Sequence, residues 1–212
     1  MIFDYYFLSF IHPIKNFIIC LLYTSYYIEK FLEKNRNLIY GDCIEIAENT
    51  YTMRFGQDKI KKSHILHLEG WGENAIKGNL ETGEGIEEEK YDCVIITQTL
   101  MFTFNLKEVA RNIYKMLKKG GNAMVTMSGI SQISRYDADL WGSYFSFHKD
   151  AVKAIFQPLF GKENMKIEVY GNCKIAVAML CGLCQEDLAE EDFNIYDKDY
   201  PIIISAILHK SN

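Results

Sequence analysis

Short apolar runs alternate with segments of helical periodicity along this chain. The clearest case lies between residues 91 and 127, where two apolar runs, Tyr91–Thr97 and Ala123–Met127, flank a helix-period segment, Leu106–Leu117. A Lys-Lys-Gly-Gly sequence at 118–121 follows that segment and is typical of a turn. The pattern predicts a strand–helix–strand unit, whose right-handed crossover makes the two strands parallel and buried. Small ligands bind at the carboxyl ends of such strands, so the unit also predicts which sheet edge holds a site.

The flanking segments continue this alternation. Further helices are predicted at residues 26–35, 149–159 and 174–183, and further strands at 43–47, within 60–68, and at 75–77, 166–170 and 202–208. Alternating elements of this kind predict an α/β fold, a Rossmann-like open sheet of about seven mostly parallel strands with helices on both faces. We expect adjacent parallel strands in the sheet core to carry Ile44, Ile46, Val94, Ile95, Ile96, Met124 and Val125.

Composition and charge narrow the function classes. The chain has 212 residues, enough for one domain that buries about 70% of its unfolded surface. Its net charge of −5 gives no basic footprint, so we expect no nucleic-acid partner. Cys181 and Cys184 form a lone CxxC without a second ligand pair at suitable spacing. This favours a helix end with two core thiols, and we expect no metal site.

The first 25 residues differ from the rest and are treated as an apolar and aromatic N-terminal segment before a domain at 26–212. His12, Pro13, Lys15 and Asn16 divide the segment, so neither apolar half approaches the roughly 20 residues that a membrane-spanning helix needs. No basic region precedes the apolar part, which argues against a signal peptide. The pattern favours a docking segment or partner surface in a cytoplasmic protein, with contact at a membrane surface as the alternative.

Several landmarks, taken in order, resemble the class I S-adenosylmethionine-dependent methyltransferases over about residues 26–210. The best-matching pieces are Ile44-Glu45-Ile46, Gly78-Asn79-Leu80, the strand at 91–96 and Leu117-Lys118-Lys119-Gly120-Gly121. The segments at 49–56 (Asn-Thr-Tyr-Thr-Met-Arg-Phe-Gly) and 129–137 (Gly-Ile-Ser-Gln-Ile-Ser-Arg-Tyr-Asp) are similar to a bacterial subgroup with a type-11-like methyltransferase domain. The resemblance implies S-adenosylmethionine as cofactor and methyl transfer as the activity.

The loop after the first strand departs from the family pattern. The family normally has a glycine-rich loop there, because a side chain would hold the backbone away from the cofactor. This chain has Ala47-Glu48-Asn49-Thr50 instead. Asn49 tolerates left-handed geometry and Thr50 can cap a helix, so the loop can persist in altered form. The missing glycines argue against a nicotinamide dinucleotide fold and keep open a catalytically inactive relative that serves as a binding or regulatory subunit.

The resemblance implies a cofactor site over the carboxyl ends of the first four strands, built from Glu45, Ala47, His64, Glu69, Asn79, Leu80 and Thr97. His64 stands where the family places an acid for the ribose diol, and Glu69 is the nearest carboxylate, so either could serve. Asn79 stands where the family often has an Asp that accepts from the adenine amino group, with a turn residue as the alternative. Glu45 matches an acid near the cofactor's amino end, with a buried structural carboxylate as the alternative.

The segment Ser131–His148 directly follows the fifth strand, so we expect it to cover the pocket mouth and set acceptor choice. It mixes polar groups with aromatic rings, whose faces pack on sugars and other rings. Tyr136 and Asp137 are the candidate acceptor-side residues, which would orient or deprotonate an acceptor hydroxyl. An ordinary cover over the sheet is the alternative. The resulting prediction is methyl transfer to a small-molecule or glycan-type acceptor, with the inactive relative or a docking module as its rivals.

Overall fold

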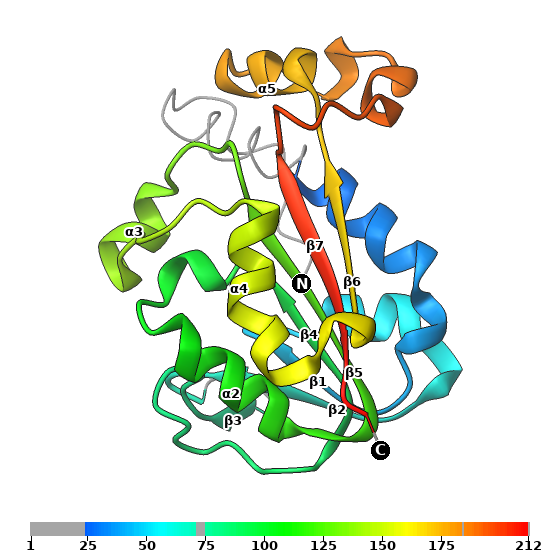
Figure 1. The fold of residues 1–212 in the computed structure, drawn as a ribbon, viewed down its shortest axis with the longest axis vertical. Coiled ribbons are helices and arrows are strands. Elements are labelled where there is room, and N and C mark those ends of the chain that lie inside the picture. The colour runs from blue at the N-terminus through cyan, green and yellow to red at the C-terminus, as the bar shows by residue number, and fades with distance from the viewer. Residues whose placement is uncertain (1–23, 71–74, 184, 212) are drawn as a thin grey trace, which may run out of the picture.

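A seven-stranded sheet forms the centre of the molecule in the computed structural model, which describes residues 24–70, 75–183 and 185–211 (Figure 1). The strands are β1 (Gly41–Ile46), β2 (Ile60–His67), β3 (Ala75–Lys77), β4 (Tyr91–Thr97), β5 (Leu117–Ser128), β6 (Met165–Tyr170) and β7 (Ile203–His209). Their order is β3-β2-β1-β4-β5-β7-β6. The first five strands are parallel, and β7 runs antiparallel to both β5 and β6. The predicted α/β class and the mostly parallel sheet are confirmed.

The strand register confirms the predicted sheet core. Ile44 pairs with Val94 between β1 and β4, and Ile95 pairs with Met124 between β4 and β5, in both cases in parallel. All four side chains are almost completely buried. Their continuous apolar runs are what a strand covered on both faces requires.

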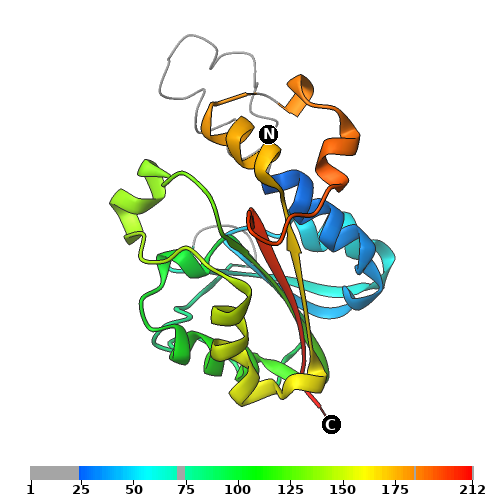
Figure 2. The same ribbon diagram turned by 45° about the horizontal axis from the view of Figure 1, so that its top comes forward.

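Helices cover both faces of the sheet (Figures 1 and 2). α2 (Leu106–Met116) and α4 (Lys149–Phe160) pack together on one face, where Val109, Ile113 and Phe156 enter the core. A helix over residues 24–34 and the short π-helix η2 (Thr52–Gly56) cover the other face. The remaining helical elements are α3 (Arg135–Trp141), α5 (Cys173–Leu180) and the 3-10 helices η1 (Arg36–Leu38), η3 (Gln57–Lys59), η4 (Leu100–Phe102), η5 (Lys162–Asn164), η6 (Gln185–Asp187) and η7 (Glu190–Asn194).

Two local predictions need correction. The Lys-Lys-Gly-Gly sequence is part of β5 and not a turn that precedes it. The reason is that the Gly120 N–H donates to the Lys210 carbonyl and the Lys210 N–H donates to the Gly121 carbonyl. Those bonds extend the ladder, and Gly120 supplies a left-handed φ of 77° where the register shifts. α5 ends at Leu180, and Cys181 is exposed rather than a core thiol. Cys184 lies outside the described residues.

The N-terminal segment at 1–25 falls almost entirely outside the described residues, so its docking role and the boundary at residue 26 stay predictions. Within the described part of the chain, no helix is both long and apolar enough to cross a membrane.

Candidate functional site

The loop after β1 keeps a glycine-type turn without a glycine. Ala47 has a φ of 67°, in the left-handed region that L-residues rarely adopt. Its N–H donates to the Leu66 carbonyl at 2.9 Å, which fixes the turn against the end of β2. Asn49 then donates to the Ser63 hydroxyl at 3.0 Å. The backbone therefore makes a left-handed turn directly after β1, and Ala47 itself is exposed.

Hydrogen bonds to the Glu45 carboxylate fix this loop. Its side chain is buried, and Oε2 accepts from the Thr52 N–H at 2.7 Å and from the Thr52 hydroxyl at 2.8 Å. Oε1 accepts from the Tyr51 N–H at 3.3 Å. Burial raises the pKa of Glu45 to about 7, although the hydrogen bonds from Thr52 and Tyr51 oppose the rise. These contacts correspond to the structural alternative for Glu45, since both oxygens already bind the chain's own donors.

The structure separates the two candidates for the ribose diol. His64 pairs with Ile44 in the middle of the sheet, and its ring lies 5.6 Å from that of Tyr91, the first residue of β4. Burial lowers the pKa of His64, and its Nε2 has no hydrogen-bond partner among the described residues. Glu69 instead follows the end of β2, where its N–H donates to Nδ1 of His67 at 3.0 Å. Glu69, and not His64, is therefore the candidate at the carboxyl edge.

His67 is an additional edge residue that the sequence pattern did not single out. It is the last residue of β2 and pairs with Lys77 of β3. The end of the apolar run could have indicated His67. Its place at the edge follows from the register of β2 against β1, because the preceding residue, Leu66, is level with Ile46 at the end of β1.

Asn79 and Leu80 follow β3 at the same edge. The Asn79 side-chain oxygen accepts from the Glu81 N–H at 2.7 Å and from the Thr82 N–H at 3.3 Å, which corresponds to the turn alternative. An adenine amino group would have to compete with these two donors. Leu80 is buried, and its carbonyl accepts from the Asn112 side chain at 2.8 Å. Leu80 is thus fixed by packing from one side and by α2 from the other.

A cleft with a cavity of about 130 Å³ opens beside the ends of β4 and β5. Its polar lining includes Gln98, Ser128, Ser131, Ser134 and Asp137, and its apolar lining includes Met101, Phe102 and Phe145. Ligand pockets usually measure roughly 300–1,000 Å³, so this cavity suits the reacting end of an acceptor rather than the whole cofactor.

Gln98 forms the inner wall of this cleft. It directly follows Thr97, the last residue of β4, and has a strained left-handed φ of 49°. Its Nε2 donates to the Thr126 hydroxyl at 3.3 Å, and its Oε1 accepts from the Ser128 hydroxyl. Bonds at both ends fix the amide, so Gln98 presents a preset polar surface between Thr97 and the cleft.

The two acceptor-side candidates lie in different places. Asp137 lines the cleft, and its Oδ2 accepts from the Ser134 hydroxyl at 2.7 Å. Ser134 is also the N-cap of α3 and accepts from the Asp137 N–H at 3.4 Å. Tyr136 is 69% exposed and does not line the cleft. The structure therefore brings only Asp137 to the site, because neighbouring helical residues point about 100° apart.

The comparisons with known proteins agree with the fold. Residues 37–125 match the family model described as a methyltransferase domain. A solved SAM-dependent methyltransferase from Archaeoglobus fulgidus has a TM-score of 0.58 at 17% identity, with 88% of this chain and 94% of that chain covered. Phosphoethanolamine N-methyltransferase 2 of Haemonchus contortus, solved with S-adenosyl-L-methionine, has a TM-score of 0.54 at 11% identity, with 90% of this chain and 57% of that chain covered. No curated protein matches.

The sheet order and these likenesses define the class I methyltransferase fold. With the match to a methyltransferase domain at 37–125, the chain is similar to S-adenosylmethionine-dependent methyltransferases in fold and in part of its sequence. The described residues fit that cofactor, since the left-handed turn at Ala47 keeps its backbone open and both Glu48 and Thr50 are exposed. Ala47, Glu69, Leu80 and Thr97 are the residues that would hold it.

Proposed function

We propose that this protein transfers a methyl group to a hydroxyl of a small-molecule or glycan-type acceptor held in the cleft between β4, β5 and α3. The observation that carries the proposal is the position of Asp137, which lines the same cleft as Gln98, the residue that follows β4. Among the described residues that line the cleft, the Asp137 carboxylate is the group that can take a proton from an acceptor. No nucleic-acid partner is proposed, because the net charge is −5.

When bound, S-adenosylmethionine would supply an electrophilic methyl group to the acceptor oxygen and leave as S-adenosylhomocysteine, while the acceptor hydroxyl loses its proton. Asp137 accepts that proton, and the Ser134 hydroxyl bonded to Oδ2 keeps the carboxylate in place. Gln98 and Ser128 orient the acceptor hydroxyl, since their side chains already hold each other in fixed positions. Positioning supplies much of the rate in such a displacement, so two fixed polar groups matter as much as the base.

On the cofactor side, the chain's contribution is mainly shape. The Ala47 backbone lets the cofactor approach the ends of the strands, and the buried Leu80 side chain anchors the turn after β3 beside it. Glu69 is the carboxylate placed to accept from the ribose hydroxyls.

An inactive relative is the second candidate, and specific contacts favour it. Glu45 and Asn79, two of the polar groups that the resemblance assigns to the cofactor, are bonded to the chain's own backbone. A protein that had lost its cofactor would keep such contacts for stability alone.

Calorimetric titration with S-adenosylmethionine and S-adenosylhomocysteine separates the two candidates. We expect both to bind at or below millimolar concentration, and tritiated methyl from S-adenosylmethionine to reach a hydroxylated acceptor pool. The matched variants are Glu69→Gln, which should weaken binding, and Glu84→Gln, an exposed carboxylate in the following loop, which should not. Absence of binding by either compound would decide for the inactive relative.

A further inference from the structure

Three aromatic side chains form one connected surface beside the acceptor cleft, here called the aromatic rim (Phe104, Tyr144 and Phe145). The Phe104 ring lies 5.4 Å from that of Tyr144, edge to face, and 6.3 Å from that of Phe145, stacked. Phe145 also lines the cleft itself. The rim is therefore continuous with the proposed acceptor site.

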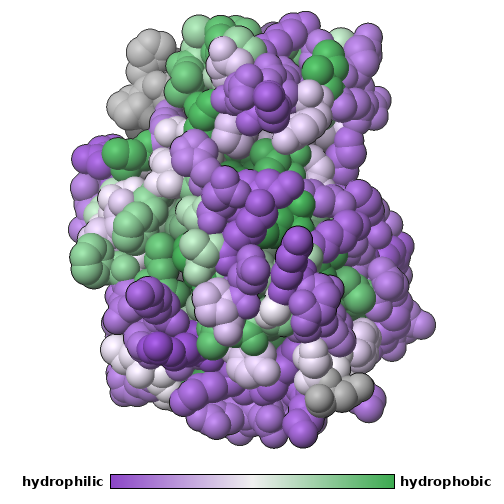
Figure 3. Space-filling view, in the orientation of Figure 1, coloured by the Kyte–Doolittle hydropathy of each residue, from purple (hydrophilic) through white to green (hydrophobic). Residues whose placement is uncertain are grey.

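The aromatic rim is unusually exposed to solvent for a group of aromatic side chains. Phe104 is 68% exposed, Tyr144 48% and Phe145 36%. Ile133, Leu140 and Trp141, from the cleft's other wall and α3, are exposed as well, and none of the residues of α3 is buried. Figure 3 shows apolar side chains gathered on this side of the molecule, at the left of the view. Contiguous apolar surface of this kind marks binding sites more often than chance.

The rim is held in place by the backbone around it. The Tyr144 N–H donates to the Met101 carbonyl at 2.8 Å, and the Phe104 N–H donates to Glu81 Oε1 at 3.2 Å. A β-carbon at Gly142, whose φ is +81°, would lie 2.6 Å from the Tyr144 ring, so glycine is required there. A backbone that is fixed before a ligand arrives loses little entropy when the side chains it carries bind that ligand.

We propose that the acceptor is amphipathic, with its hydroxyl at the polar floor of the cleft and a flat apolar body lying on the aromatic rim. This inference rests on the proposed function and narrows its acceptor class. The floor near Gln98, Ser128 and Asp137 is polar, whereas the rim presents ring faces and a single phenol. A polyhydroxylated ring would lose water on the rim without gaining matching hydrogen bonds, so a flat apolar ring system fits better.

The test uses 2-naphthol, a flat bicyclic ring with one hydroxyl, and methyl glucoside as the polar counterpart. Each is titrated into the full chain both with and without S-adenosylhomocysteine, and binding is followed by naphthol fluorescence and by calorimetry. We expect naphthol to bind at least tenfold more tightly than the glucoside. Phe104→Ala combined with Tyr144→Ala should weaken naphthol binding about tenfold or more, because the variant loses two aromatic ring contacts together with their buried area.

The control is Tyr40→Ala combined with Leu180→Ala, which removes two exposed apolar side chains remote in sequence from the rim. This variant should bind naphthol like the unmodified protein. Equal naphthol affinity in the rim variant, or tighter binding of the glucoside, would overturn the proposal. The proposal would also be overturned if the unmodified protein bound lipid vesicles or self-associated and only the rim variant lost that property. Such a result would assign the rim to a membrane or to a second copy of the chain. Loss of S-adenosylhomocysteine binding alone would instead count against the proposed function, because naphthol binding is also read without it.

Discussion

The Glu45 carboxylate in β1 lies 2.7 Å from the backbone nitrogen of Thr52, at the start of the helical turn that follows the cofactor loop. One buried side chain thus joins the strand that bears the site to the loop that shapes it. The same oxygen accepts from the Thr52 hydroxyl at 2.8 Å, so the loop depends on a single carboxylate.

The protonation of Glu45 should make stability depend on pH. Burial raises its pKa to about 7 from 4.5, so the folded state favours the protonated form. Its contribution is therefore full below pH 4.5 and is lost as the pH rises through 7, by up to about 3 kcal/mol. In thermal unfolding between pH 5 and 8, the melting temperature of the unmodified protein should fall, relative to that of Glu45→Gln, as the pH rises.

Between pH 5 and 8, His64 changes stability in the opposite direction, because its lowered pKa favours the neutral ring in the folded state. The comparison with Glu45→Gln cancels that contribution. Glu48→Gln, an exposed acid on the same loop, is the control and should keep the pH dependence. A pH profile unchanged by Glu45→Gln would contradict the assignment.

The left-handed backbone at Ala47 should make glycine the better residue there. Ala47 has a φ of 67°, which costs an alanine roughly 1 kcal/mol relative to glycine. Ala47→Gly should therefore stabilise the fold by up to about that amount, offset in part by the entropy of the unfolded chain. Urea unfolding measures it. Ala154→Gly, at an exposed position inside α4, should instead destabilise by about 1 kcal/mol, and a loss of stability at both positions would argue against strain at Ala47.

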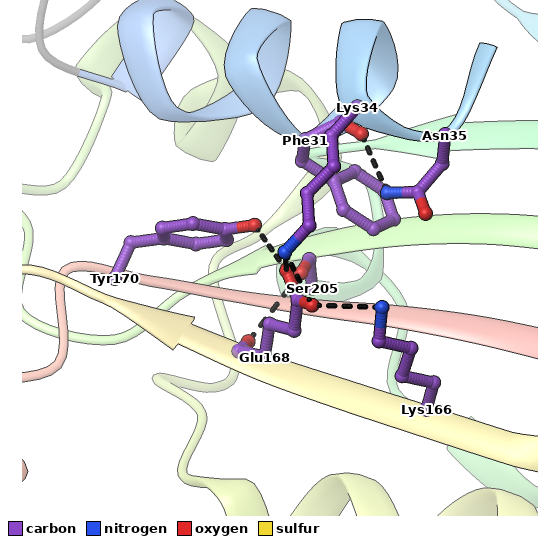
Figure 4. A network of polar contacts seen from close by, with 7 residues as sticks. All are labelled: Phe31, Lys34, Asn35, Lys166, Glu168, Tyr170 and Ser205. Atoms are coloured by element: carbon purple, nitrogen blue, oxygen red, sulfur yellow. Dashed lines mark hydrogen bonds and ion pairs between the residues drawn. The ribbon is translucent and has the colours of Figure 1, made fainter.

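A network around Glu168 ties the helix over residues 24–34 to the edge strand β6 (Figure 4). Its carboxylate accepts from Lys34 at 2.8 Å, from Lys166 at 3.0 Å and from the Tyr170 hydroxyl at 2.6 Å. Burial alone would raise the pKa of Glu168, but the hydrogen bonds from Lys34, Tyr170 and Lys166 lower it to about 2.

Removing that charge should destabilise the fold at neutral pH and progressively less in acid. A lowered pKa means that the contribution of Glu168 is present above pH 4.5 and is lost as the pH falls through 2. Chemical unfolding of Glu168→Gln at pH 7 and at pH 3 should thus show a smaller difference from the unmodified protein at pH 3. Glu163→Gln, an exposed acid in η5, should show little difference at either pH, and a pH-independent loss in Glu168→Gln would point to packing instead.

The sheet could be predicted from sequence because its signal is local. Runs such as Val94–Ile96 need burial on both faces, and the crossover lengths between them fix the parallel direction. α3 could not be predicted in this way, since none of its residues is buried and no apolar face of it enters the core. Its position depends on the Ser134 cap and on contacts with η4.

The site was harder to predict because each assignment depends on a tertiary partner. His64 and Glu69 are five positions apart, and only the pairing of β2 with β1 shows which one reaches the sheet edge. Asn79 has the right residue type for the adenine, yet its oxygen is engaged by the Glu81 and Thr82 backbone. Family resemblance identified the positions, but it could not show which side chains were already bonded.

Replacing Asp137 gives the sharpest test of the proposed chemistry. If its carboxylate takes the acceptor proton, Asp137→Asn should lower turnover by roughly a hundredfold or more, because general-base catalysis typically contributes that much. The amide still reaches Ser134 Oγ, so α3 should keep its place and cofactor affinity should not change.

Asp139→Asn makes the same charge change on an exposed position of the same helix and should leave turnover intact. Tyr136→Phe should also have little effect, because that side chain is 69% exposed and lies outside the cleft. Unchanged turnover in Asp137→Asn would reduce the segment to structural cover, and lost cofactor binding would place Asp137 on the other side of the pocket.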